Sequence, residues 1–333
     1  MSKNTHITDI VKQFGFDEMA WYSSNDGTLR IHDGKKSFVL CQARMDEEHL
    51  KRWETVFRVA NEKKIRSIVP IYPTLKGDLY VKDNQRMYYL TPYIEETHSC
   101  SPTDVMSEIG VIHAQSNHTF LIEKKTLRKK YSTYKNKLQA KQIELRQLID
   151  LFEQQRYMSP LGLQVCTHFH IVDDAITIGM EHVDAIIRIC TEDEHEHVEW
   201  SSSICHNRLS MDNVIKNHQI YVKNWEGVTF DNGTTDLVRF LKNEFLRNEF
   251  PIDVFVEGLH AYEKNKPFSL IEKHMLHVHL LHPIHYMNMA ASIRIPNQKT
   301  SHLQSVIALE RAFRVISSSL HVLSTYEQPV NSD

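Results

Sequence analysis

Residues 204–213 read Ile-Cys-His-Asn-Arg-Leu-Ser-Met-Asp-Asn, and the spacing inside this stretch decides the predicted fold. His206 and Asn213 are spaced as in a phosphoryl-transfer loop, His-x-Asp-x-x-x-x-Asn. In such a loop the Asp orients or deprotonates the attacking hydroxyl, and the Asn helps to hold magnesium. Arg208 occupies the Asp position. A guanidinium stays protonated and has no acceptor lone pair, so Arg208 cannot be a general base. The stretch therefore has the spacing of such a loop and lacks its catalytic carboxylate.

A second departure follows at Asn224. Two short apolar runs flank residues 216–218, a pattern that predicts a β-hairpin. Kinases place the second metal-binding Asp after such a hairpin, and Asn224 occupies that position here. An amide offers one neutral oxygen and cannot balance the charge of a magnesium–triphosphate complex. With a cation at position 208 and no anion at 224, the local charges oppose metal binding.

Two neighbouring side chains offer alternative chemistry. Asp212 is the one carboxylate in the loop that could replace the missing base, but a turn residue bonded to its own backbone is the favoured interpretation. Cys205 adjoins His206, yet adjacent residues rarely direct their side chains at each other, and no third orienting group is evident. We therefore expect Cys205 to be a buried thiol.

Further segments resemble a known family in the same order along the chain. Residues 67–81 and 87–95 are similar to the last strands of its N-lobe and its hinge, and 109–113 to the helix after the hinge. Residues 235–241 resemble a helix start whose Asp, here Asp236, braces the catalytic loop. The chain thus resembles the aminoglycoside phosphotransferase/choline kinase-like superfamily. Within it, the resemblance is to the spore coat kinase-like proteins of endospore-forming bacteria, the YutH group.

The resemblance implies an α+β, bilobal protein-kinase-like fold. Residues 1–95 are expected to form a small strand-rich N-lobe, an antiparallel sheet plus one helix, in which 77–78 form the turn of a hairpin. Residues 96–333 are expected to form a larger, mainly helical C-lobe with a degenerate catalytic loop at 204–226. The heptad-like apolar spacing in 123–157 predicts a long helix packed within the chain, with a coiled coil to a partner as the alternative. Other helices are expected at 162–191, 234–248, 252–265, 269–282 and 302–321.

The nucleotide site expected in this fold is also depleted. The loop between the first strands contains one glycine, Gly27. Cys41 occupies the third-strand Lys position, or Gln42 if the register differs by one residue. Glu54 on the next helix could be the usual partner of that Lys, although a solvated helix Glu is favoured. Cys41, Glu54 and Asn213 then outline a vestigial ATP–magnesium site, with no functional cofactor expected.

Composition limits the remaining function classes. The chain has 333 residues, of which 41% are apolar, an ordinary share for a globular protein. Its formal net charge of −3 indicates neither nucleic acid nor an anionic membrane as a partner. No apolar run reaches the about 18 residues of a membrane span. Five cysteines without CxxC spacing indicate reduced thiols and synthesis in the cytoplasm.

Histidine is unusually abundant, with 21 residues. One group mixes acids and imidazoles over 192–199; another comprises His274, His277, His279, His282 and His285. Zinc sites do use histidines three or four residues apart, but they need further ligands and supporting hydrogen bonds. We therefore interpret both groups as structural or solvent-facing and expect no metal site.

These observations favour a non-catalytic role. The resemblance implies a pseudokinase made in the mother-cell cytoplasm that acts as a structural or assembly component of the spore coat, with other spore coat proteins as partners. We further hypothesise that Arg208 fills the emptied metal site and pairs with Glu226 or Asp236. Two alternatives stay open: a small-molecule phosphotransferase with a rearranged active site, and a module that senses a nucleotide or metal by binding it tightly without forming product. As a partner of the pseudokinase itself, only a weakly bound nucleotide is expected.

Overall fold

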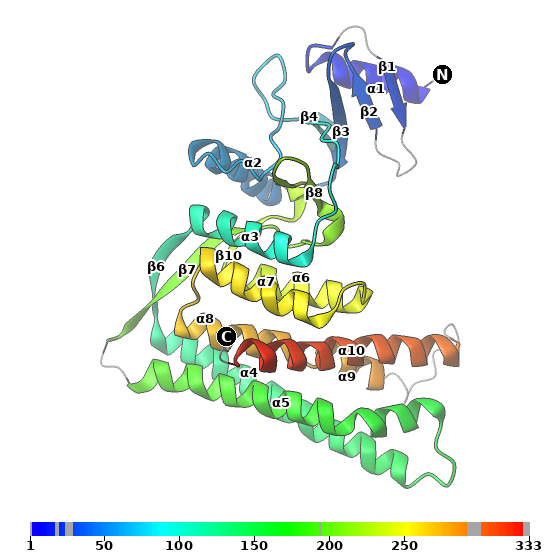
Figure 1. Cartoon of the computed structure of the whole chain (residues 1–333), viewed down its shortest axis with the longest axis vertical. Coiled ribbons are helices and arrows are strands. Elements are labelled where there is room, and N and C mark those ends of the chain that lie inside the picture. Colours follow the sequence, from blue (N-terminus) through cyan, green and yellow to red (C-terminus); the bar gives the residue numbers. More distant parts are fainter. Residues whose placement is uncertain (1, 17–19, 24–28, 193–194, 292–300, 329–333) are drawn as a thin grey trace, which may run out of the picture.

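Two lobes of different composition make up the molecule (Figure 1). The structure, a computed structural model, describes residues 2–16, 20–23, 29–192, 195–291 and 301–328. Strands dominate the N-terminal lobe, and long helices dominate the rest. The predicted mixed α+β class, with a small strand-rich N-lobe and a larger helical C-lobe, is confirmed.

The N-lobe contains an antiparallel sheet with the strand order β1-β2-β3-β5-β4. Its strands are β1 (Ala20–Ser23), β2 (Leu29–His32), β3 (Ser37–Ala43), β4 (Val81–Asp83) and β5 (Arg86–Pro92). Along β3, buried and partly exposed side chains alternate, because successive side chains of a strand point to opposite faces. One face of β3 therefore packs into a core and the other faces the space between the lobes.

Two helices flank this sheet. The predicted helix is α2 (Glu47–Glu62), which begins where the Asp46 carboxylate accepts a hydrogen bond from the His49 N–H and which buries Trp53. Helix α1 (Ser2–Lys12) was not predicted, and Ile10 belongs to a second hydrophobic core against the sheet. The predicted hairpin turn at 77–78 is wrong. Those residues lie in a separate turn, and the hairpin of β4 and β5 turns at Asn84, which has a φ of 52°.

Helices form most of the C-lobe. They are α3 (Pro102–Ser116), α4 (Lys124–Glu153), α5 (Pro160–Glu192), α6 (Thr234–Arg247), α7 (Ile252–Asn265), α8 (Leu270–Leu280), α9 (Ile284–Ala291) and α10 (His302–Tyr326). Helix α4 packs along α5 at one side of the lobe (Figure 1). Its apolar stripe, which includes Leu138 and Leu145, is buried, so the predicted packing within the chain is confirmed. Among the described helices, none combines the length and apolar character needed to cross a bilayer.

Short strands lie before and after the loop at residues 206–213. Strands β6 (His118–Glu123), β7 (His197–Cys205) and β10 (Thr229–Asp231) form a sheet with the order β10-β7-β6, which the sequence did not predict. The predicted hairpin is confirmed as β8 (Val214–Lys216) and β9 (Ile220–Val222). Because β7 ends at Cys205, the loop begins at the buried end of the central strand of the β10-β7-β6 sheet.

The hairpin also ties the two lobes together. The Val222 N–H donates to the Ser67 carbonyl at 2.7 Å, and the Val69 N–H donates to the Val222 carbonyl at 3.1 Å. On the other strand, the Lys216 ammonium lies 2.7 Å from the Asp104 carboxylate at the start of α3. These contacts fix the position of the loop relative to the N-lobe sheet.

Candidate functional site

His206 anchors the loop from inside the protein. Its side chain is fully buried, and its Nε2–H donates to the Lys223 carbonyl at 2.8 Å. Its Nδ1 accepts from the Arg208 N–H at 3.3 Å. This arrangement requires a neutral ring with its proton on Nε2. Burial lowers the pKa of His206 and the Asp236 charge opposes that shift. The imidazole therefore joins the loop to the end of β9 as a neutral group.

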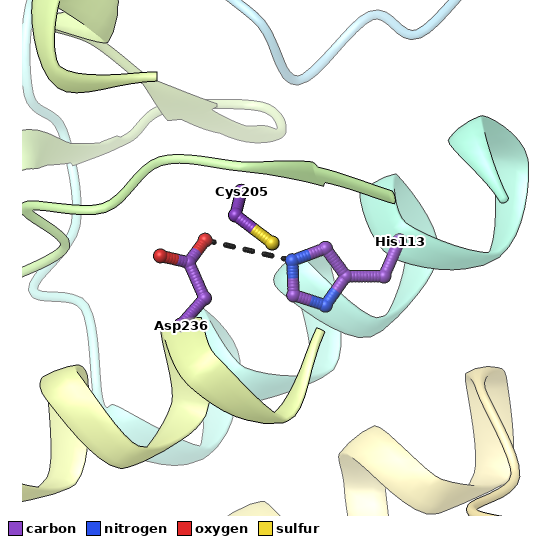
Figure 2. Close-up of side chains that lie close together, drawn as sticks. All are labelled: His113, Cys205 and Asp236. Carbon is purple, nitrogen blue, oxygen red and sulfur yellow. Dashed lines mark ion pairs between the residues drawn. The ribbon is translucent and has the colours of Figure 1, made fainter. Parts of the chain in front are cut away.

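Asp236, near the start of α6, lies beneath the loop. Its carboxylate accepts hydrogen bonds from the backbone N–H groups of His206 and Asn207, at 2.5 and 2.7 Å. The His113 Nε2 lies 3.5 Å from the same carboxylate, with both side chains fully buried (Figure 2). Burial alone would raise the pKa of Asp236, but the interaction with His113 and the hydrogen bond from the Asn207 backbone N–H hold it below its ordinary value. A buried carboxylate thus holds the loop backbone in place.

Cys205 lies beside that pair (Figure 2). Its thiol donates weakly to the Asp231 carbonyl at 3.4 Å, and burial raises its pKa well above the ordinary value. The His206 ring donates to Lys223 instead of meeting this thiol. Cys205 is therefore a buried, protonated thiol. His113, Cys205 and Asp236 come close enough to suit a metal ion, but each is engaged within the protein.

Arg208 is exposed, and its aliphatic stem lies against Gly227. The hypothesised pairing with an acid is wrong. Glu226 accepts a hydrogen bond from the Tyr89 hydroxyl, and Asp236 is buried under the loop. Within the described part of the chain, no carboxylate forms an ion pair with the Arg208 guanidinium. A cation without a neutralising acid therefore stands where a general base would be.

The two residues at the expected metal positions bond to each other. The Asn224 side-chain N–H donates to the Asn213 side-chain oxygen at 2.9 Å, and the Asn213 side-chain N–H donates to the Arg208 carbonyl at 2.7 Å. Asn224 adopts a left-handed backbone conformation with a φ of 66°, which asparagine tolerates better than most residues. The oxygen that would face a metal ion thus accepts a hydrogen bond from a neighbouring amide.

Beside the loop lies a hollow of about 550 Å³. The cations that line it are Arg208, Arg239 and Arg247. Arg247 pairs with Asp212, and hydrogen bonding to this guanidinium lowers the pKa of the Asp212 carboxyl. The Asp212 carboxylate is therefore bound by an arginine of α6 and not by its own backbone. It faces a cation and not the position of a reacting hydroxyl.

A cleft of about 430 Å³ lies between the lobes. Cys41 on β3 lines it, whereas Gln42 does not and lies 3.5 Å from Arg86, which is the arrangement expected if Cys41 occupies the third-strand Lys position. Burial raises the pKa of Cys41 to about 11. The thiol is therefore neutral near pH 7 and cannot replace the charge of a lysine.

Glu54 does not line this cleft. It lies near Tyr80, whose pKa is raised by burial and by the Glu54 charge. Two cations that the sequence did not single out do line the cleft: Arg30 on β2, whose guanidinium stacks 4.1 Å from the centre of the Tyr93 ring, and Lys223. Only the position of Lys223 directly before Asn224 could have drawn attention to it. Gly27 and residues 193–194 of the first histidine group lie outside the described residues.

Comparisons with known proteins bear on both the loop and the fold. The family model described as "Spore coat putative kinase YutH" matches residues 186–325. The curated protein "Endospore coat-associated protein YutH" of Bacillus subtilis (strain 168) is 27% identical over 113 residues, which are 33% of this chain and 32% of that protein. The chain thus aligns with about a third of the length of that relative. The predicted resemblance to the spore coat kinase-like group is confirmed over this region.

Solved structures show the fold alone. An aminoglycoside phosphotransferase from Alicyclobacillus acidocaldarius subsp. acidocaldarius DSM 446 has a TM-score of 0.68 at 11% identity, covering 96% of this chain and 95% of that one. A microcompartment-associated aminopropanol kinase has a TM-score of 0.53 at 12% identity, covering 97% and 98%. The predicted bilobal, protein-kinase-like fold is confirmed.

Proposed function

We propose that this chain is a kinase-like protein without phosphotransferase activity that serves as a structural or assembly component of the bacterial spore coat. The observation that carries the inactive state is the hydrogen bond from Asn224 to Asn213. It occupies the oxygen that would bind magnesium, and it does so beside the Arg208 cation.

The size of the missing catalytic contributions supports the loss of activity. A positioned general base contributes roughly 10²–10⁴-fold to a rate, and Arg208 cannot supply it. Phosphoryl transfer depends almost wholly on positioning and on electrostatic stabilisation by metal ions. Here Asn224 stands where the metal-binding Asp is expected, and the neutral Cys41 stands in the position of the phosphate-binding lysine.

An activity assay tests this part of the proposal. The purified chain is incubated with magnesium–ATP and with a panel of small hydroxylated acceptors, including an aminoglycoside, choline and an amino alcohol, and phosphorylated product is measured by mass spectrometry. We expect no product above the level of an Asn213→Ala variant. Turnover that this substitution abolishes would contradict the inactive state. It would favour the alternative function, a small-molecule phosphotransferase with a rearranged active site.

The coat role is supported by the family match and by the coat association stated in the name of the Bacillus subtilis relative. Partners would then be other spore coat proteins, met after synthesis in the mother cell. A fluorescent fusion expressed in a sporulating endospore former should form a shell around the developing spore. Signal that stays diffuse in the mother cell throughout coat formation would contradict a coat role.

Nucleotide binding without turnover is a second candidate function. The interlobe cleft supports it, because Arg30 and Lys223 provide positive charge next to the aromatic Tyr93. In a thermal-shift titration, ATP at 100 times its dissociation constant should add about 2.7 kcal/mol of stability. We expect any such shift to be independent of magnesium and to shrink in an Arg30→Ala/Lys223→Ala variant. A magnesium-dependent shift would instead indicate a working metal site.

A further inference from the structure

Three helices bring histidines and a carboxylate together on the C-lobe, away from the kinase-like loop. His182 comes from α5, His274 and His277 come from α8, and Glu327 caps the end of α10. One ligand atom from each of His182, His277 and Glu327 lies within 4.8 Å of the other two. The sequence spacing indicated only His274 and His277, because the other two residues lie far from them along the chain.

His277 has a fixed tautomer. Its side chain is 6% exposed, and its Nδ1 lies 3.0 Å from the Lys273 carbonyl. A carbonyl can only accept, so Nδ1 carries the proton and the neutral ring has its lone pair on Nε2. Metal-binding histidines are oriented in this way, by donating the second ring N–H to a backbone carbonyl.

The free side of His277 faces a negative group. Its Nε2 lies 2.9 Å from the Glu327 carboxylate yet forms no hydrogen bond in the structure. Two acceptors at this distance repel each other unless a cation joins them, and the cation can be either a second ring proton or a metal ion. The geometry therefore places a buried ring nitrogen without a hydrogen-bond partner next to a carboxylate.

His182 and His274 complete the cluster. The His182 ring stacks on His277 with ring centres 3.9 Å apart, and its Nδ1 lies 2.9 Å from the Nδ1 of His274. One of these two Nδ1 atoms donates to the other, which holds the His274 ring beside His182. Three imidazoles held this closely cannot all be charged without strong mutual repulsion.

We propose that His182, His277 and Glu327, with His274 in contact with His182, form a binding site for a divalent transition metal of the zinc class. Imidazole nitrogens with one carboxylate are a typical zinc donor set. With zinc–ligand bonds of about 2.0–2.2 Å, tetrahedral ligand atoms lie about 3.4 Å apart. The His277 Nε2 and the Glu327 carboxylate are 2.9 Å apart, and the ligand atoms of His182, His277 and Glu327 all lie within 4.8 Å of one another, so small side-chain rotations bring these three donors to the required spacing. Magnesium and calcium prefer oxygen ligands and are excluded by the nitrogen-rich set.

The surroundings allow an ion to enter. Glu327 is 56% exposed, and a hollow of about 420 Å³ next to it is lined by His277 and Glu327 themselves. The bound ion would join the end of α10 to α5 and α8, three helices that meet in the C-lobe (Figure 1). Its main effect would then be to stabilise the C-terminal helix on the lobe.

The test uses the full chain, stripped of metal with a chelator and titrated with Zn²⁺ against a competing chromophoric chelator. We expect one zinc ion per chain, a rise in Tm on binding, and no response to magnesium. His277→Gln and Glu327→Gln should each weaken zinc binding at least about 10-fold, since even residues that only support a ligand change affinity by about 10–100-fold. His285→Gln, at an exposed histidine outside the cluster, is the matched control and should bind like the original chain.

Glu327→Gln keeps the test independent of folding, because it changes an exposed side chain at a helix end. X-ray absorption at the zinc edge adds a second measurement, with nitrogen or oxygen neighbours expected at about 2.0–2.1 Å. Sulfur neighbours at about 2.3 Å would place the ion on the free cysteines and overturn the proposal. Zinc binding that both variants retain, or no zinc binding to the original chain, would overturn the proposal.

Discussion

The side-chain amide of Asn224 donates a hydrogen bond of 2.9 Å to the side-chain oxygen of Asn213. In an active loop the residues at these positions would both direct oxygen atoms at a magnesium ion. Here one of them supplies a donor, so the two side chains satisfy each other without a metal. The amide at position 224, together with the cation at position 208, therefore opposes cation binding in this corner of the cleft.

Restoring both carboxylates should restore metal binding. In an Arg208→Asp/Asn224→Asp variant, Asn213 and the new Asp at position 224 would both present acceptors, while the cation at 208 is removed. Without metal, we expect the variant to be less stable by about 1 kcal/mol, because the hydrogen bond to Asn213 is lost. Addition of magnesium with ATP should raise its Tm, whereas the original chain should not respond to magnesium.

Asn224→Asp alone provides the control for this experiment. It keeps the Arg208 cation beside the site, so its magnesium response should be weaker than that of the double variant. An equal magnesium-dependent shift in the original chain and the double variant would show that the hydrogen bond between the two asparagines does not close the site.

The buried brace under the loop should be sensitive to loss of charge. Asp236→Asn removes the partner of His113 and one acceptor of the loop N–H groups. Breaking a buried pair in this way costs about 3–5 kcal/mol, to be measured by chemical denaturation. Asp212→Asn is the matched control. Because the Asp212–Arg247 pair is largely exposed, its loss should cost less than about 1 kcal/mol. Similar losses for both variants would argue against the brace.

Two helix glycines should respond oppositely to alanine. At Gly110 in α3, an added Cβ would lie 3.0 Å from the Tyr262 carbonyl of α7, so Gly110→Ala should separate the helices and lower stability by about 1–3 kcal/mol. At Gly179 in α5 the nearest atom would be 3.8 Å away, an ordinary contact. There the higher helix propensity of alanine should add up to about 1 kcal/mol. Urea denaturation of both variants checks the signs.

Acidification should destabilise the fold through His282. The pKa of His282 is lowered to about 4, mainly by burial. The positive charges of three nearby lysines add to this shift; they are Lys242, Lys137 and Lys141. The unfolded chain protonates this ring near pH 6.5, whereas the folded chain does so only near pH 4. The unfolded state thus binds more protons in this window, and the free energy of unfolding falls as pH falls from about 6.5 to 4.

The pH dependence can be assigned with two variants. Denaturation at pH 7, 6 and 5 should show a shallower decline for His282→Gln than for the original chain. His285→Gln, three residues away at an exposed position, should keep the original slope. An unchanged slope in His282→Gln would mean that other histidines carry the effect.

Local spacing sufficed for the predictions that depend on one segment. The order of residues in 204–224 indicated the loop, the hairpin and the exchanged residues Arg208 and Asn224, because a catalytic loop is read from positions only a few residues apart. Periodic apolar residues likewise indicated α4 and α5 to within a few residues. Both patterns involve residues close together in the chain, and the structure contradicts neither prediction.

Side-chain partners could not be predicted in the same way. Arg30 and Lys223 meet in one cleft because a strand of the N-lobe and the end of β9 come together, and no spacing encodes that. The expected acid partner of Arg208 failed for the same reason, since Tyr89 from the N-lobe sheet bonds to Glu226. The sequence does not show that His182 and Glu327 lie beside the histidines of α8. For that reason these histidines were interpreted as structural. Contacts between distant segments decide these cases.

The brace at Asp236 also bears on the order in which the molecule assembles. Helices α4 and α5 follow each other in the chain and pack along each other, so bringing them together requires only a short loop to close. The loop, by contrast, needs Ser203 to bond to the His113 carbonyl across 90 residues and Asp236 to bond to His206 across 30. Such non-local contacts form slowly. We therefore expect pulsed hydrogen exchange to find amides of the helical pair protected first and those of the loop protected late.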